Sequence, residues 1–215
     1  MYSVIIPTMW VNPTMLFRML DVYNDHPLIG EVLLINNNDS GDIPVLVDKV
    51  RMIGNGINKY VNPSWNYGVS LAKYDKVIIA NDDIFIRDFS LLMDMIDAHL
   101  KPGDVIGVHN TCYSIKNKFN VGGFAEIKPR ILPARVRNWG WGTFMVLHKK
   151  DYVHIPDEYK IWYGDDFQFN KLRPFAFIGI CIETKMSETL DSNHKLSALA
   201  VKDRRLYEKR NRRKS

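Results

Sequence analysis

Two adjacent carboxylates, Asp82 and Asp83, follow a short apolar run, VIIA at positions 77–80. Two negative charges at the end of a buried strand repel each other and lose hydration, so a fold retains them where another group offsets the charge. Mg²⁺ and Mn²⁺ suit this role, because they bind carboxylate oxygens and are often shared with substrate phosphates. The alternative is a solvated turn, since Asn and Asp are common turn formers. The pair therefore indicates either a divalent cation site or a polar turn.

Polar residues also close two other expected strands. Thr8 ends the run SVIIPT at 3–8, and the residues NNND at 36–39 close the run EVLLIN at 31–36. In open α/β sheets, ligands bind outside the carboxyl ends of the strands. Because Thr8, residues 36–39 and residues 81–83 all fall at such ends, we expect them to meet in one binding site.

Strand-like and helix-like segments alternate through the first half of the chain. Strands are expected at 3–8, 31–36, 76–80 and 104–110, and helices at 13–25, 44–53, 62–74 and 89–100. Such alternation implies right-handed crossovers and a mostly parallel sheet. The predicted fold class is therefore α/β, with a central sheet flanked by helices.

The second half of the chain is less regular. Residues 109–138 contain a Gly-Gly pair, two prolines and scattered cations without steady periodicity. A loop of this length in a compact domain is usually functional or mobile. We expect it to be mobile without ligands and to become ordered over a bound ligand, excluding water. An aromatic stretch at 138–152, an apolar strand at 175–182 and a final loop containing His194 follow.

Length and composition suggest one soluble domain. The chain has 215 residues, of which 46% are hydrophobic, enough for one sizeable core. The N-terminus lacks the basic start of a signal peptide, and the longest apolar stretch is far shorter than the roughly 20 residues of a membrane helix. Cys112 and Cys181 have no close spacing partner, which favours buried free thiols over a disulfide and suggests a reducing, cytoplasmic setting.

The positive charge of the chain is concentrated at its end. The net charge is +5, but residues 202–215 alone carry eight basic and two acidic residues, which leaves about −1 for the rest. Such a run is typical of a solvated helix end or a disordered linker. It also suits an electrostatic contact with an anionic membrane surface or a nucleic acid.

The ordered set of motifs resembles a known family. SVIIPT, INNNDSGD, WNYG, VIIANDDIFI and YGDDFQF occur in the order and approximate spacing of GT-A glycosyltransferases, particularly the family 2-like enzymes. The resemblance covers roughly residues 1–200. It implies a single GT-A (Rossmann-like) domain with a nucleotide-binding half at 1–108 and an acceptor half at 109–200, followed by a basic tail or linker at 201–215.

The same resemblance implies a site for a nucleotide-sugar donor. Its donor-binding positions here are Pro7, Thr8, Met9, Asn36, Asn37, Asn38 and Asn66. The family usually carries an acid after its second strand, where this chain has asparagines. An amide can both donate and accept, so it can still read uracil. For Asn66 the alternative is an ordinary polar residue on an exposed helix face.

The resemblance also assigns the metal site. Asn81, Asp82 and Asp83 match the family's Asp-any-Asp motif, with an amide at its first position. Asp83 then matches the direct ligand of Mn²⁺ or Mg²⁺, and Asp82, the middle residue of the motif, is expected to help Asp83 hold the cation between the protein and the diphosphate. His194 resembles the histidine that completes the metal site in many of these enzymes, and Lys195 is placed to neutralise the departing diphosphate; a solvated loop histidine is the alternative.

A second pair of acids matches the family's catalytic segment. In YGDDFQF, Asp166 takes the place of the catalytic base and Asp165 that of the preceding Glu. A positioned carboxylate that accepts the proton of an attacking hydroxyl contributes about 10² to 10⁴ in rate. The alternative is a helix start at which acids are favoured by the macrodipole. Trp139 and Trp141 either line the acceptor site or pack in the core.

Together these features predict a metal-dependent hexosyltransferase that moves a sugar from a nucleotide-diphosphate donor, with UDP-glucose as the best guess, to an acceptor hydroxyl with inversion. The acceptor is expected to be a glycan, with a lipid, a protein or modified DNA as alternatives. A sugar nucleotidyltransferase is one rival, but PTMWVNPTM at 7–15 lacks the Gly-rich basic loop of those enzymes. A non-catalytic nucleotide-sugar-binding domain is the other.

Overall fold

The computed structural model describes the whole chain except residues 12, 39–47, 55–56, 115–123, 185–193 and 213–215. Its strands are β1 (Tyr2–Thr8), β2 (Ile29–Asn36), β3 (Val50–Ile53), β4 (Lys76–Ala80), β5 (Ile84–Ile86), β6 (Asp104–Val108), β7 (Arg130–Pro133), β8 (Phe144–His148), β9 (Arg173–Ile178) and β10 (Ile182–Thr184). Its α-helices are α1 (Pro13–Asp25), α2 (Val61–Leu71), α3 (Phe89–His99), α4 (Gly164–Lys171) and α6 (His194–Arg212). Short 3₁₀ turns are η1 (Asn110–Cys112), η2 (Trp141–Thr143) and η3 (Lys149–Asp151).

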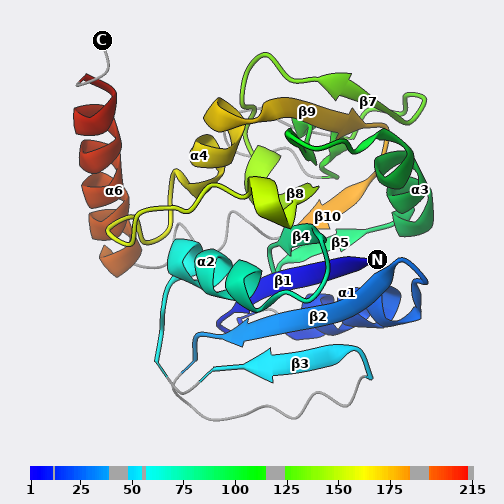
Figure 1. Cartoon of the computed structure of the whole chain (residues 1–215), viewed down its shortest axis with the longest axis horizontal. Helices are drawn as coiled ribbons and strands as arrows, with labels where there is room; N and C mark the ends of the chain where they lie inside the picture. The colour runs from blue at the N-terminus through cyan, green and yellow to red at the C-terminus, as the bar shows by residue number, and fades with distance from the viewer. Residues whose placement is uncertain (12, 39–47, 55–56, 115–123, 185–193, 213–215) are drawn as a thin grey trace.

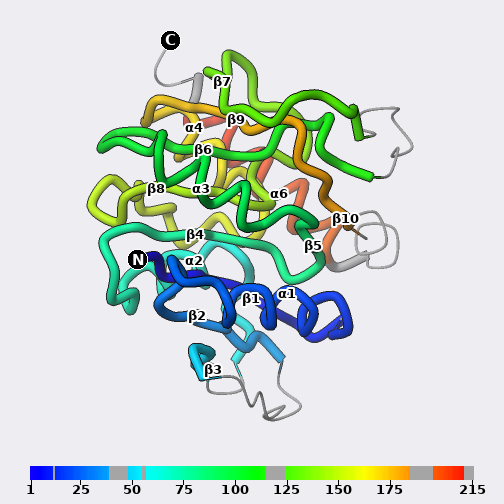
Figure 2. The backbone as a smooth tube through the Cα atoms, turned by 90° about the vertical axis from the view of Figure 1, so that its right-hand side faces the viewer, coloured from blue at the N-terminus to red at the C-terminus, as the bar shows by residue number. Residues whose placement is uncertain are grey.

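One mixed sheet of eight strands, in the order β3-β2-β1-β4-β8-β6-β9-β7, runs through the molecule. Six strands point the same way, while β8 and the edge strand β7 run antiparallel to their neighbours. Figure 1 shows α1 and α2 on opposite faces of the β1–β2 region, and Figure 2 shows the strands stacked from β3 to β7. The predicted α/β class with a mostly parallel central sheet is confirmed.

The core has two halves, one on each face of the sheet. Every residue of β1 is buried, as expected for a central parallel strand covered on both sides. Val4 and Ile6 belong to one apolar cluster and Ile5 to the other, because successive side chains of a strand point to opposite faces. The carboxyl ends of β1, β2 and β4 are thereby held side by side.

The helix expected at 44–53 is wrong for the residues that are described, because β3 occupies Val50–Ile53 and pairs with β2. Val50 and Met52 pack against one cluster and Ile53 against the other, which is the alternation of a strand. The expected loop at 109–138 also contains regular structure, namely η1 and β7. Its central residues, 115–123, lie outside the described part of the chain, so the expected ordering of this loop over a ligand stays a prediction.

The apolar stretch at 175–182 is two strands rather than one. β9 ends at Ile178, Gly179 adopts a φ of 76° that favours glycine, and β10 follows at Ile182. β10 pairs with β5 in a separate two-stranded sheet.

In the described part of the chain no helix is long and apolar enough to cross a membrane.

The basic end of the chain is a packed helix in its first part. Residues 201–212 belong to α6, so the boundary expected at residue 200 falls inside a helix. Asp203 of α6 is fully buried and accepts hydrogen bonds from the backbone amides of residues 160–162. Tyr207 stacks on Tyr163 at a centroid distance of 4.4 Å. The helix is therefore part of the domain, since its side chains fix the segment before α4.

Candidate active site

The ends of β1, β2 and β4 are joined by side-chain hydrogen bonds. The Thr8 hydroxyl donates to Asp82 Oδ2 at 2.6 Å and accepts from the backbone amide of Trp10 at 2.9 Å. Trp10 has a φ of 60°, a costly conformation for a bulky residue, and its indole donates to Asn36 Oδ1 at 3.1 Å. The expectation that Thr8, Asn36 and Asp82 meet at one edge of the sheet is confirmed by these bonds.

Asp83 is a buried carboxyl group with little around it to offset a negative charge. Its side chain is 8% exposed, and its Oδ1 atom is buried with no hydrogen-bond partner among the described residues. Burial, and secondarily the charge of Asp82, raise the pKa of Asp83 to about 7, against a hydrogen bond from the Asn81 side chain. Burial also raises the pKa of Asp82, which the Thr8 hydroxyl opposes.

Such a carboxylate pair fits a hard divalent cation, because a bound cation would remove the repulsion and satisfy the unpartnered Asp83 oxygen. The described residues contain no group of three or more His, Cys, Asp or Glu side chains that could hold a metal by themselves. A cation here would therefore share its remaining positions with water or a ligand. The side chains of His194 and Lys195 lie outside the described part of the structure, so their predicted roles stay predictions.

The three asparagines after β2 divide their contacts between two neighbours. Asn36 Oδ1 accepts from Trp10 and also from the backbone amide of Asn38 at 3.0 Å. Asn37 accepts from the Lys59 amide at 3.0 Å and donates to the Ser64 hydroxyl at 3.1 Å. These hydrogen bonds attach the segment before α2 to the end of β2, and they occupy the side-chain amide of Asn37.

The remaining donor positions differ in exposure. Pro7 is buried in β1 opposite Ile35, whereas Met9 is 44% exposed just beyond the strand, and its backbone bonds to Asp82. Asn66 lies on α2, where its Nδ2 donates to the Ile155 carbonyl at 2.7 Å and its Oδ1 accepts from the Tyr152 hydroxyl at 2.9 Å. Asn66 thus holds residues 152–155. Among the described residues it makes no hydrogen bond with the strand-end cluster, namely Thr8, residues 36–38 and residues 81–83.

A second carboxylate pair opens α4. Arg137 bridges it, with Nη1 at 2.9 Å from Asp165 Oδ2 and Nε at 3.0 Å from Asp166 Oδ1. Asp166 Oδ2 is buried and has no partner among the described residues. Burial, and then the charge of Asp165, raise the pKa of Asp166 to about 6, while Arg137 opposes the rise. The Arg137 guanidinium therefore holds Asp166 Oδ1, whereas Oδ2 has no partner among the described residues and can accept a proton.

The residues at 140–143 connect the two carboxylate pairs. The Thr143 carbonyl accepts from the Asn81 amide at 2.9 Å, and the Tyr113 hydroxyl bonds to both the Gly140 carbonyl and the Thr143 hydroxyl at 2.6 Å. A Cβ atom at Gly142 would lie 2.5 Å from Asp165 Oδ2, so only glycine allows this close approach. Burial raises the pKa of the Tyr113 hydroxyl, and the charges of Cys112, Asp83 and Asp165 act in the same direction, while the Thr143 hydrogen bond opposes the rise.

Sequence reasoning missed Arg137, Tyr113 and Thr143. Nothing in their spacing marks them, although the GWG triplet at 140–142 signals a tight backbone approach. Trp141 is fully buried and its indole donates to the Phe175 carbonyl at 3.0 Å, so it belongs to the core. Trp139 packs edge-on against Tyr113 at a centroid distance of 4.9 Å and is partly exposed.

No protein-family model and no curated protein matches this sequence. Solved structures do match. TarS 1-349 from S. aureus has 16% identity and a TM-score of 0.58, over 85% of this chain and 60% of that one. GalNAc-T7 with UDP, GalNAc and Mn²⁺ has 10% identity and a TM-score of 0.60, over 85% and 43%. HddC from Yersinia pseudotuberculosis has 18% identity and a TM-score of 0.51, over 86% and 93%.

These likenesses show that the chain has the GT-A fold, as the motifs predicted. The chain spans less than two thirds of the length of TarS 1-349 and of GalNAc-T7. At identities this low the likeness shows the fold alone. The activity therefore has to be argued from the site itself.

Proposed function

We propose that this chain is a metal-dependent glycosyltransferase of the family 2 type, which moves a sugar from a nucleoside diphosphate donor to an acceptor hydroxyl. The observation that carries the proposal is that residues 140–143 join two carboxylate pairs, Asp82 with Asp83 and Asp165 with Asp166: the Thr143 carbonyl accepts from the amide of Asn81, and Gly142 lies directly against Asp165. The pair Asp82 and Asp83 suits a divalent cation, which would stabilise the diphosphate leaving group. The pair Asp165 and Asp166 suits a general base, which would accept the proton of the attacking hydroxyl.

The donor half of the site would hold a nucleotide at the strand ends. Asp83, with Asp82, would hold Mn²⁺ or Mg²⁺, which stabilises the diphosphate leaving group as a Lewis acid. Thr8 and the backbone of Met9 orient Asp82, while Asn36 and Asn38, which are hydrogen-bonded to each other, are the proposed neighbours of the nucleobase. We propose a UDP-sugar, with UDP-glucose as the best candidate; the GalNAc-T7 neighbour was solved with UDP, and another TarS structure with UDP-GlcNAc.

The acceptor half would supply the base. Asp166 Oδ2 would accept the proton of the attacking hydroxyl. The hydroxyl oxygen forms the bond to the anomeric carbon while the bond from that carbon to the diphosphate breaks. Arg137 holds Oδ1 and leaves Oδ2 without a hydrogen-bond partner among the described residues. With a pKa of about 6, Asp166 is mostly ionised at neutral pH. Direct attack by an activated hydroxyl gives inversion at the anomeric carbon.

Donor turnover tests the proposal against its rivals. The purified chain, incubated with UDP-glucose and other nucleotide sugars and Mn²⁺, is expected to release UDP slowly by hydrolysis and faster with an acceptor. A binding domain would bind the same donors without releasing UDP. A nucleotidyltransferase would instead form pyrophosphate from a nucleoside triphosphate and a sugar phosphate. Absence of UDP release from every donor that binds would contradict the proposal.

A further inference from the structure

A cavity of about 510 Å³ opens on the outer face of α2. Pro63, Asn66, Tyr67 and Ser70 line it, whereas the buried residues of α2, among them Trp65, face the sheet. The opposite walls come from residues 57–60 and from the segment at 154–160. The cavity is thus separated from the strand-end cluster by the helix, and a volume of this size suits a small ligand.

Two cations face this cavity without a carboxylate partner. Lys59 and Lys160 both line it, and within the described residues neither forms an ion pair. Their ammonium groups lie over aromatic rings instead, Lys59 at 5.1 Å from the Tyr67 centroid and Lys160 at 5.9 Å from that of Tyr60. The carboxylate in the wall, Asp157, is largely exposed and lies 4.0 Å from His154. Two unpaired cations around one hollow attract an anion.

The same cavity offers contacts for a ring that carries hydroxyl groups. Tyr67 is 38% exposed, so part of its ring is open to a ligand. Asn58, Ser70 and His154 add side chains that donate or accept hydrogen bonds. An amphipathic aromatic surface beside polar groups suits sugar rings, and the lysines suit an acidic substituent on them.

The segments that wall the cavity are hydrogen-bonded to both halves of the active site. On one side, the Lys59 amide donates to Asn37 of the strand-end cluster. On the other, Asn62 of α2 donates from its backbone to the Lys160 carbonyl and from its side chain to the Trp162 carbonyl, both at 3.0 Å. Residues 160–162 lead directly into α4 with its carboxylate pair. The segment that lines the cavity thus continues into the helix that carries the proposed base.

We infer that the cavity binds the acidic part of a glycan acceptor, a sugar unit that carries a phosphate or a carboxylate, at a distance from the hydroxyl that reacts. Only the statement that this ligand belongs to the acceptor rests on the proposed function. Anion binding by Lys59 and Lys160 itself depends only on the geometry of the cavity.

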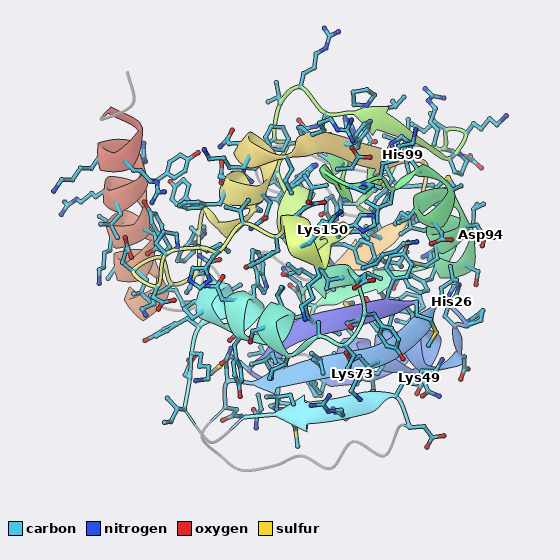
Figure 3. All side chains as sticks on the ribbon, in the orientation of Figure 1. His26, Lys49, Lys73, Asp94, His99 and Lys150 are labelled. Carbon is cyan, nitrogen blue, oxygen red and sulfur yellow. The ribbon has the colours of Figure 1, made fainter. Side chains whose placement is uncertain are left out.

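Calorimetric titration of the full chain, saturated with UDP and Mn²⁺ to block the donor site, tests the inference. The probes are glucose 6-phosphate, glucuronic acid and neutral glucose. At least one acidic probe is expected to bind, and to bind at least about tenfold more tightly than glucose. The double variant Lys59→Gln/Lys160→Gln should weaken that binding at least about tenfold, as loss of two charge-assisted contacts would. Lys150→Gln, an exposed lysine on η3 outside the cavity (Figure 3), should leave it unchanged.

The two acidic probes distinguish a phosphate from a carboxylate ligand. Equal affinity for glucose and both acids, no saturable binding of either acid, or an undiminished affinity in the double variant would each overturn the inference. Thermal melts confirm that both variants are folded. If the chain binds no UDP, the proposed function fails, and the same titrations without UDP still decide whether the cavity binds an acidic sugar.

Discussion

Replacing Asp203 by Asn tests how α6 holds the start of α4. The Asp203 carboxylate is fully buried, and its Oδ2 accepts from the amides of Lys160 at 3.1 Å, Ile161 at 2.9 Å and Trp162 at 3.1 Å. Asparagine has nearly the same volume but no charge, and it presents one acceptor oxygen and one donor group. The substitution therefore removes the charge that three amide dipoles share, without opening a cavity.

The loss of stability follows from the number of these bonds. A hydrogen bond to a charged group contributes roughly 1 kcal/mol more than a neutral one, so weakening three of them should cost about 3 kcal/mol of unfolding free energy. In a domain of this length each kcal/mol lowers the melting temperature by roughly 2 to 4 °C. The melting temperature of Asp203→Asn should therefore fall by about 6 to 12 °C.

Urea unfolding and thermal melts followed by circular dichroism measure both quantities. Glu208→Gln is the matched control, because Glu208 lies on the same helix but is exposed, and its ion pair among the described residues is with the exposed Arg204. Its effect should stay within about 0.5 kcal/mol. An Asp203→Asn variant as stable as the control would refute the account, since α6 would then not depend on this carboxylate for its attachment.

The remaining predictions concern the base and its surroundings. Asp166→Asn should leave UDP binding intact and lower sugar transfer by at least about 10², measured by UDP release; if Asp165→Asn does this instead, the base is its neighbour. In the native chain kcat/KM should rise with pH through about 6, because Asp166 must lose its proton to act as base. Arg137→Met removes the cation that opposes this rise in pKa, so the same limb should move to higher pH; an unshifted limb would exclude Asp166 as its source. Gly142→Ala should lower transfer more than UDP affinity, because the added methyl group displaces Asp165; equal losses would argue against that placement.

The strands that carry the donor cluster were predictable because their local pattern and their burial agree. The runs that became β1, β2 and β4 are apolar and end in polar residues, as buried parallel strands do when a site lies at their carboxyl ends. Asp82 and Asp83 could be singled out for the same reason. The start of α4 at Gly164 agrees with the alternative given for Asp165 and Asp166, a helix start at which acids are favoured by the macrodipole.

What the sequence does not reveal depends on contacts between distant segments. The local sequence of Val50–Ile53 fits a helix as well as a strand, and its pairing with β2 makes it a strand. Arg137 resembles any loop cation until the fold places it between Asp165 and Asp166. The charge of the C-terminal segment suggests a solvated tail, because Asp203 is outnumbered by cations and its partners are backbone amides some 40 residues earlier.

Calorimetric titration of UDP into the native chain and into Asp83→Asn, each with and without Mn²⁺, tests the central claim most directly. The native chain should bind UDP tightly only with Mn²⁺, and Asp83→Asn should lose the metal-dependent part, because the substitution removes the charge of the buried carboxylate with the unpartnered oxygen. Asp94→Asn, an exposed acid on α3 (Figure 3), is the control and should behave as the native chain. Equal UDP affinity of Asp83→Asn and the native chain in the presence of Mn²⁺ would contradict the metal site and the glycosyltransferase mechanism built on it.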